Sequence, residues 1–366
     1  MEATLMLPKF GKGKPVVGLD IGHHSVKMIQ LEPVASGWRV VRVNQIATPQ
    51  NSLRDGAIQE DEVLAEALRQ LVRSSKTTVS NCHISVSGGS VVVRNVRVPK
   101  MSEAMLRKSI RFEAGRYIPN SIEESYIDFE ITGETQDDQM DVMMVAAPKE
   151  LVDSRIRACQ LAGIEVESVD LEPFAAYRSL VQANYGIDIT QDTMAMVDIG
   201  HSTTKVAVIQ KGQFAMIRSI PHGGLTLTNA LQQYFKLSYQ DAEEGKTQLD
   251  VRGLLDDMPS ENAPLRVIQP HLDDLVREMR RSINYFTAQQ AETGQTGQIS
   301  WMILSGGGAK LSGAAEYLGS RLGIRVYTSG VFDNPRFAYV GDAYYGQGSE
   351  LSVASGLAMR SFSKAA

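Results

Sequence analysis

The stretch VVGLDIGHHSVKMIQLEP, residues 16–33, places a carboxylate, a glycine, a hydroxyl and a lysine around one bend between two apolar strands. A second stretch, TMAMVDIGHSTTKVAVIQKG, residues 193–212, repeats this arrangement. Five positions of the two stretches match at a constant offset of 178 residues: Asp20, Gly22, His23, Ser25 and Lys27 with Asp198, Gly200, His201, Thr203 and Lys205. An internal repeat of this kind indicates a duplicated structural unit. The sequence therefore predicts two lobes of related design, each opening with a strand, a tight turn and a second strand.

The two bends carry residue types that suit a nucleotide triphosphate. Glycine lets backbone N–H groups approach phosphate oxygens closely, and these groups neutralise charge without filling the pocket. We expect the bends to face each other across one cleft, with their N–H groups directed at the phosphates. The residues expected to line this cleft are Asp20, Gly22, His23, His24, Ser25 and Lys27 in the first bend, and Asp198, Gly200, His201, Ser202, Thr203 and Lys205 in the second.

The aspartates of the two bends predict a magnesium ion. A carboxylate beside a phosphate is repulsive unless a cation lies between them, and Mg²⁺ binds few carboxylates while keeping most of its waters. Asp20 and Asp198 therefore predict Mg²⁺ held mostly through water. The sequence leaves two interpretations open for Lys27 and Lys205. Their ammonium groups bind phosphate oxygens, or the two lysines lie on solvent-facing strand positions.

Three further motifs fit the same cleft. Gly223-Gly224 precede a helix, and Gly306 to Gly308 lie between a buried strand and a helix. The second position suits a base or phosphate resting on bare backbone, although alone it fits a tight strand-to-helix connection equally well. Glu243 and Lys246 are three residues apart on an expected helix, where they bind ribose hydroxyls or form an exposed ion pair.

Charge and composition exclude several other classes of protein. The formal net charge is −5 with no basic stripe, which argues against nucleic acid as a partner. The chain has two cysteines and no CxxC motif, so no zinc ribbon or disulfide framework is predicted. Zinc at His23-His24 is disfavoured because adjacent hairpin residues point to opposite faces. No apolar run reaches the roughly 18 residues of a membrane-spanning helix.

Local patterns predict the elements of the first half. DEVLAEALRQLVRSS, residues 61–75, has the apolar spacing of an amphipathic helix. HISVSGGSVVVRNVRV, residues 83–98, predicts a hairpin of two strands around Gly88-Gly89. Residues 99–163 predict helix, strand, strand and helix, with Ser102 as the first N-cap.

As a set, these motifs resemble the actin-like ATPase superfamily, which includes actin, heat-shock chaperones and sugar kinases. DIGHHSVK and DIGHSTTK are similar to its two phosphate motifs, VDLEPFAAY to its connecting segment and LSGGGAKLSG to its adenosine motif. The resemblance implies an α/β, bilobed actin-like fold of the duplicated ribonuclease-H-like kind that binds ATP with Mg²⁺. It places Gly223, Gly224, Glu243 and Lys246 on the ribose side, and Gly306, Gly307, Gly308 and Lys310 at the adenosine.

The segment between residues 99 and 163 resembles the inserted subdomain of FtsA. EAGRYIPNSIEESYIDFEI, residues 113–131, and CQLAGIEVESVDLEPFAAYRSL, residues 159–180, are more similar to the PilM family of type IV pilus assembly. The expected domains are a tail at 1–14, lobe I at 15–190 and lobe II at 191–366. Lobe I divides into a core at 15–98 and 164–190 and the insertion at 99–163, and lobe II into a core at 191–235 and 296–360 and a helical subdomain at 236–295.

The PilM resemblance implies a cytoplasmic, ATP-binding adaptor at the inner face of the inner membrane. Members of this family bind the N-terminal cytoplasmic tail of the membrane protein PilN, and so join the PilN–PilO complex to the pilus motor. The membrane is then reached only through a partner. Tyr117, Ile118, Ile122 and Phe129 either line the groove for this tail or form the insertion's own small core.

Two other functions remain open from the sequence. One is an FtsA-like protein that self-associates into filaments. The other is a small-molecule kinase, for which Asp170 and Glu172 are the local candidates for a base. Asp198 or Glu172 could also position a water molecule for ATP hydrolysis. We expect tight Mg-ATP binding with little steady-state turnover, because an adaptor needs only slow hydrolysis.

Overall fold

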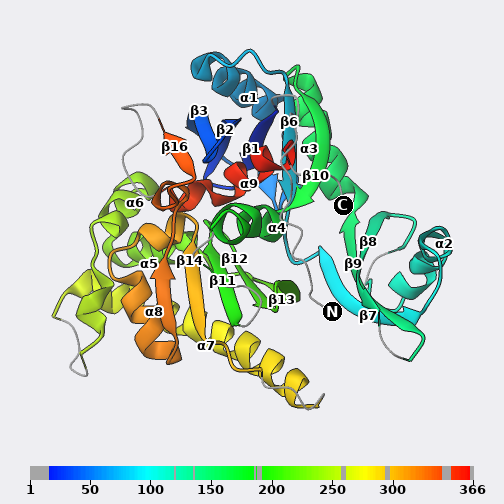
Figure 1. Cartoon of the computed structure of the whole chain (residues 1–366). Coiled ribbons are helices and arrows are strands. Elements are labelled where there is room, and N and C mark those ends of the chain that lie inside the picture. The colour runs from blue at the N-terminus through cyan, green and yellow to red at the C-terminus, as the bar shows by residue number, and fades with distance from the viewer. Residues whose placement is uncertain are drawn as a thin grey trace.

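The computed structural model of the chain describes residues 16–118, 121–134, 137–184, 187, 192–256, 261–292, 297–339 and 348–362. The expected tail at 1–14 lies outside these residues. Two large sheets form the centres of two lobes, with helices packed around them (Figure 1). This arrangement confirms the predicted bilobed α/β fold.

The sheet of lobe I has six strands in the order β10-β6-β1-β2-β3-β16. β1 pairs antiparallel with β2 and parallel with β6, and its five residues are all buried. The strands are β1 (Val17–Ile21), β2 (Ser25–Val34), β3 (Gly37–Ala47), β6 (Asn81–Val86), β10 (Glu165–Leu171) and β16 (Phe337–Tyr339). A short ribbon of β4 (Leu53–Arg54) and β5 (Ala57–Ile58) precedes helix α1 (Asp61–Ser75), which confirms the helix predicted there.

The sheet of lobe II has five strands in the order β13-β12-β11-β14-β15. Its strands are β11 (Thr193–Ile199), β12 (Thr204–Gln210), β13 (Gln213–Ile220), β14 (Trp301–Ser305) and β15 (Arg325–Thr328). The helices of this lobe are α5 (Gly224–Phe235), α6 (Tyr239–Thr247), α7 (Ala263–Glu292) and α8 (Ala314–Leu322), with short turns η2 (Val251–Leu254) and η3 (Gly307–Lys310). Apolar side chains of α5, α7 and α8 pack on this sheet in one core.

The duplication predicted from the sequence is present in the strand register. Asp20 on β1 lies opposite Lys27 on β2, and Asp198 on β11 lies opposite Lys205 on β12. β1 and β11 also each have a parallel neighbour on their other side, β6 and β14. The same side chains are therefore presented at the same end of both sheets.

The end of the described chain returns to lobe I, which the expected domain boundaries had placed in lobe II. β16 pairs with β3 of the first sheet, and α9 (Ser352–Arg360) follows the short turns η4 (Val331–Asp333) and η5 (Ser349–Leu351). α9 packs against β1 and β2 on one side and against α4 (Glu172–Tyr177) on another. Gly18 and Gly356 allow this close packing, since a Cβ on either would overlap the backbone of Ala354 or Ala175. α4 and α9 thus lie between the two sheets (Figure 1).

A small third sheet in the order β7-β9-β8 stands apart from both lobes, at the right of Figure 1. Its elements are β7 (Val92–Pro99), α2 (Glu103–Ala114), β8 (Ser125–Glu134) and β9 (Gln139–Pro148). Ser102 caps α2 as predicted, because its side chain accepts a hydrogen bond from the Met105 N–H. The predicted hairpin at Gly88-Gly89 is wrong, since β6 joins the lobe I sheet while β7 pairs with β9.

Helix α3 (Lys149–Leu161) also departs from the expected division. It was assigned to the insertion, but Ala158 and Cys159 pack with α1 and the lobe I sheet in one core. The helix is followed by Gly163, whose φ of 77° is the left-handed conformation typical of the residue after a helix end. The π-helical turn η1 (Arg178–Gln182) continues α4.

Candidate functional site

A cavity of about 450 Å³ lies between the two lobes, where the two bends face each other. It brings together every residue predicted to bind the nucleotide, including those far apart in the sequence. Those residues are Asp20, Gly22, His23, His24, Ser25, Lys27, Asp198, Gly200, His201, Ser202, Thr203, Lys205, Gly223, Gly224, Glu243, Lys246, Gly306, Gly307, Gly308 and Lys310, together with Glu172. What they bind is not given by this placement and stays a prediction.

The first bend is closed by its own backbone and by a neighbouring threonine. The Gly22 N–H donates to the Ser25 carbonyl at 3.2 Å, and Thr48 Oγ1 donates to the Gly22 carbonyl at 2.6 Å. Lys27 Nζ lies 3.0 Å from Asp20 Oδ2, and both side chains are largely buried. Burial opposes the charge of Lys27, but the Asp20 carboxylate outweighs it and raises the Lys27 pKa. Lys27 therefore lies inside the cleft and not on a solvent-facing position.

The second bend has the same backbone closure but is tied to a helix as well. The Gly200 N–H donates to the Thr203 carbonyl at 2.9 Å, as in the first bend. The first N–H groups of α5 then donate back to the bend, from Gly224 to Gly200 at 3.0 Å and from Leu225 to His201 at 2.8 Å. Glycine is needed at 223, because a Cβ there would lie 2.5 Å from the His201 carbonyl oxygen.

Lys205 makes a different ion pair from its counterpart Lys27. Its Nζ lies 2.7 Å from Glu172 Oε2, so it joins β12 of lobe II to the start of α4. Burial disfavours the charged Glu172, but the Lys205 ammonium overcomes this and holds the pKa of Glu172 well below its usual range. Lys205 thus lies in the cleft, like Lys27.

Asp198 is left without a lysine at contact distance in the described residues, and Ser305 Oγ donates to its Oδ2 at 3.2 Å. Burial raises the pKa of Asp198 despite the opposing charge of the Lys205 ammonium, and the neighbouring Glu172 and Asp20 act in the same direction as burial. A buried carboxylate of this kind is stabilised by a cation. The surroundings of Asp198 therefore favour a positively charged ligand or metal.

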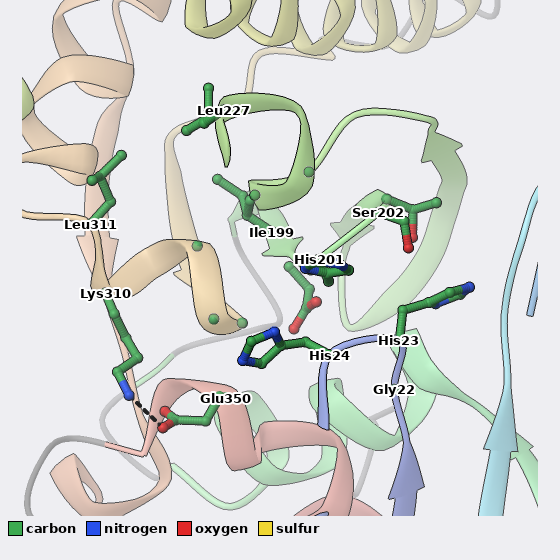
Figure 2. Close-up of a pocket in the computed structure, with 18 of the residues that line it drawn as sticks. Gly22, His23, His24, Ile199, His201, Ser202, Leu227, Lys310, Leu311 and Glu350 are labelled. Atoms are coloured by element: carbon green, nitrogen blue, oxygen red, sulfur yellow. Dashed lines mark hydrogen bonds and ion pairs between the residues drawn. The ribbon is translucent and has the colours of Figure 1, made fainter. Parts of the chain in front are cut away.

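The glycine-rich loop after β14 forms another wall of the cavity. Gly306 has a φ of 85°, and its N–H donates to the Ser349 carbonyl at 3.0 Å. A Cβ on Gly308 would overlap the Ile199 side chain, so the loop lies directly against the second bend. Lys310 at the end of this loop pairs with Glu350 at 2.8 Å (Figure 2).

Glu243 and Lys246 form the ion pair that the sequence left open, and they also line the cavity. Lys246 Nζ lies 2.7 Å from Glu243 Oε2 and 3.3 Å from the Gly224 carbonyl oxygen. Thr228 Oγ1 donates to Glu243 at 2.6 Å. Burial opposes ionisation of Glu243, but the hydrogen bonds from Lys246 and Thr228 prevail and lower its pKa.

Several lining residues were missed by sequence analysis. Glu350 gave no signal, because it comes 40 residues after Lys310 and has no motif around it. The apolar lining residues gave no signal either, because apolar side chains are typical of ordinary core positions. They include Leu272 and Leu275 on α7, Leu311, and Tyr317 and Leu318 on α8. These side chains give the cavity an apolar compartment of the kind that holds a planar base.

Three histidines of the bends lie at the mouth of the cleft. His23 and His24 point in different directions, as predicted for adjacent residues of a hairpin (Figure 2). The His24 and His201 rings are 5.3 Å apart. Burial lowers the pKa of His23 and His24, and lowers that of His201 to about 4. Within the described ranges, no group of three or more His, Cys, Asp and Glu is arranged to hold a metal ion directly.

Asp170 lies outside the cavity lining, so the structure does not support it as a base for a kinase. Its Oδ2 accepts hydrogen bonds from Arg178 at 2.9 Å and Arg360 at 3.0 Å. These bonds join β10 to η1 and α9. Asp170 is thus held in a buried ion pair at the junction of the lobes.

The four candidate groove residues differ in whether they pack against the core of the insertion. Ile118 and Phe129 pack against the core of the insertion, which is the alternative that the sequence left open. Tyr117 is exposed, and Ile122 is half-buried against Gly115. All four keep some exposed surface, since Ile118 and Phe129 are only partly buried, and Tyr117 is the most exposed of them.

No helix among the described residues combines the length with the apolar composition that crossing a bilayer requires.

Duplicated hairpins facing one cleft, closed by α4 and α9, define an actin-like fold of the ATPase superfamily. MreB 5 of Spiroplasma citri bound to AMPPNP has this fold, with a TM-score of 0.52, 13% identity and coverage of 94% of this chain and 95% of that chain. The cell division protein FtsA of Pseudomonas aeruginosa is 24% identical over 389 residues, covering 91% of this chain and 89% of FtsA.

The particular family is shown by a match over nearly the whole chain. A family model described as type IV pilus assembly protein PilM matches residues 18–362. The chain therefore belongs to the PilM family. A chain of the solved PilM-PilN type IV pilus biogenesis complex is similar, with a TM-score of 0.82, 26% identity and coverage of 95% of this chain and 99% of that chain.

Proposed function

We propose that this protein is an ATP-binding adaptor of type IV pilus assembly that binds the N-terminal cytoplasmic tail of PilN. The observation that carries the proposal is the cleft, in which both bends, the glycine-rich loop and the Glu243–Lys246 pair surround one cavity. Membership of the PilM family and the likeness to a chain of the PilM-PilN complex support the partner. Through PilN, the protein would act at the inner face of the inner membrane and reach PilO and the motor indirectly.

The residues of the cleft fit a magnesium nucleotide. Backbone N–H groups of the bends and the loop would bind phosphate oxygens, and the apolar compartment beside Tyr317 would hold the base. Asp20 and Asp198 would hold Mg²⁺ through water, and the buried Asp198 without a lysine contact is the observation that fits a cation. When bound, the metal neutralises charge between these carboxylates and the phosphates.

We expect slow hydrolysis at most. Glu172, the candidate for positioning water, is engaged by Lys205 at 2.7 Å, and its pKa is lowered. A carboxylate that holds a buried lysine is poorly placed to accept a proton from water. Tight binding with little turnover agrees with the role of an adaptor.

A continuous set of contacts supports coupling between the cleft and the insertion. Glu172 begins α4, and Phe174 and Tyr177 of α4 pack on Phe214 of lobe II with ring centroids 4.8 and 5.0 Å away. The Phe214 carbonyl accepts a hydrogen bond from Asn95 of β7 at 2.8 Å.

A second contact joins the start of β13 in lobe II to the insertion. Gln213 Nε2 donates to the Thr132 carbonyl on β8 at 2.8 Å. A change of lobe angle at the cleft would therefore move the insertion. Nucleotide would shift the balance of shapes only by its differential affinity for them.

The test is calorimetry of a synthetic PilN N-terminal peptide against the full chain, with and without Mg-ATP. We expect the peptide to bind both with and without Mg-ATP. Its affinity should differ between the two conditions, because the insertion contacts lobe II. The matched variant is Asn95→Ala with Gln213→Ala, which removes both amide bonds while leaving the cleft intact. It should bind ATP normally and lose the nucleotide effect on the peptide. Absence of peptide binding in every condition would contradict the adaptor function.

A further inference from the structure

Helix α2 of the insertion presents large apolar side chains to solvent. Its inner face is buried through Leu106, Ile110 and Ala114 on the small sheet. Met105 is 61% exposed and Phe112 is 80% exposed. They are seven residues apart, or about two turns of an α-helix, so they lie on the same outward face. Among the described residues, the fold leaves Phe112 largely uncovered.

The same helix is basic on a chain whose net charge is −5. Arg107, Lys108 and Arg111 of α2 and Arg116 just beyond its end are all exposed, against the carboxylates Glu103 and Glu113. Two of the cations are neutralised locally, since Arg107 lies 2.9 Å from Glu103 and 3.9 Å from Asp128, and Arg116 lies 3.0 Å from Glu113.

The other two cations stay available for a partner. Across the described residues, neither Lys108 nor Arg111 forms an ion pair. Arg111 donates only to the Ile122 carbonyl, at 3.4 Å. Lys108 lies three residues after Met105 and four before Phe112, so it neighbours both on the outward face of α2. Arg111 lies three residues after Lys108 and borders this face on the flank that contacts the Ile122 carbonyl.

We propose that this outward face of α2, defined by Met105, Lys108, Arg111 and Phe112, binds the headgroup region of a bilayer that contains anionic lipid. An exposed helix that carries both apolar side chains and cations suits the surface of a bilayer. The apolar side chains enter the boundary of the acyl chains, and the cations contact the lipid phosphates. An anionic surface attracts this face and repels the acidic remainder of the chain, so it also orients the molecule.

The contact is weak by itself, since one short helix provides two cations and two apolar side chains. It gains effect when the protein is already held near the membrane, because tethering raises the effective concentration of the second site. The inference goes beyond the proposed function, and direct lipid binding is measurable without PilN.

The experiment is vesicle flotation of the full chain, using phosphatidylcholine alone and a mixture with phosphatidylglycerol. We expect binding to the mixture at low salt and its loss at high salt, because the Debye length falls from about 30 Å at 0.01 M to about 8 Å at 0.15 M. Phe112→Ser should weaken binding about 10-fold. Lys108→Glu with Arg111→Glu should abolish it.

The controls use residues of matched exposure outside α2. Tyr285→Ser on α7 replaces a side chain that is 64% exposed, and Arg277→Glu reverses a cation whose side chain is 66% exposed. Both should bind vesicles like the unaltered chain, and all variants should keep their affinity for Mg-ATP.

Equal binding to the two vesicle types, or equal effects of Phe112→Ser and Tyr285→Ser, would overturn the proposal. So would a concentration-dependent dimer that Phe112→Ser dissociates in the absence of vesicle binding, because the face would then serve a second copy. Retained ATP and PilN-peptide affinity in that case would leave the proposed function standing.

Discussion

The two bends of the cleft have the same sequence pattern and the same strand register, yet their lysines make different ion pairs. Lys27 contacts the aspartate directly across its own hairpin, at 3.0 Å. Lys205 lies opposite Asp198 in the strand register, but its ammonium group contacts Glu172 of the other lobe, at 2.7 Å. The first pair stabilises one hairpin, whereas the second joins two lobes and leaves a buried aspartate for a cation. A duplicated motif has thus acquired two physical roles.

The largest expected effect comes from breaking the pair between the lobes. Lys205→Met leaves Glu172 buried without its lysine, and loss of one partner of a buried pair costs about 3–5 kcal/mol. We expect this loss of unfolding free energy in urea denaturation, with faster hydrogen exchange at α4. Lys27→Met is the matched control, and its effect on exchange should stay within β1 and β2. The same exchange pattern in both variants would show that the two pairs do not differ in role.

A smaller effect is expected on magnesium-dependent binding of ATP. Asp198→Asn keeps the size of the side chain but removes the charge, so affinity in Mg²⁺ should fall about 10- to 100-fold. Asp20→Asn should cost less, because it frees the Lys27 ammonium to bind phosphate, and the binding that remains should depend less on Mg²⁺. Calorimetry with Mg²⁺ and with EDTA separates the two. Unchanged affinity of Asp198→Asn would count against the metal position.

The smallest effect concerns pH. Burial lowers the pKa of His201 to about 4, while an unfolded histidine titrates near ~6.5. The stabilisation from keeping His201 neutral is therefore complete above the pKa of the unfolded histidine. It is lost as the pH falls from that pKa toward 4, the pKa in the folded protein. His201→Gln should flatten the decline of unfolding free energy over this window.

The first bend provides the comparison for this titration. Burial lowers the pKa of His24 and Glu243 opposes the shift, whereas at His201 the neighbouring His24 acts together with burial ahead of the opposing Glu243. His24→Gln should therefore flatten the decline less than His201→Gln does. Equal slopes of urea-derived stability against pH in the two variants would contradict the difference.

Sequence analysis placed the cleft residues correctly because glycine, aspartate and lysine in fixed spacing reflect backbone geometry that is local to each bend. It failed at Gly88-Gly89, where a turn signal joined strands of two separate sheets. It also did not anticipate that α3 packs with the lobe I sheet or that α9 packs with both large sheets. Helix periodicity identifies an apolar face but not the sheet that covers it.

The sequence by itself determined the duplication, the two bends and the glycine-rich and charged motifs that line the cavity, since each depends on nearby residues and their spacing. Only the tertiary structure decided which carboxylate each lysine contacts, and it alone brought Glu350 to Lys310 and α9 back to lobe I. The physical reason is that an ion pair or a packed face depends on distances between segments far apart along the chain, and these distances exist only once both lobes are folded against each other.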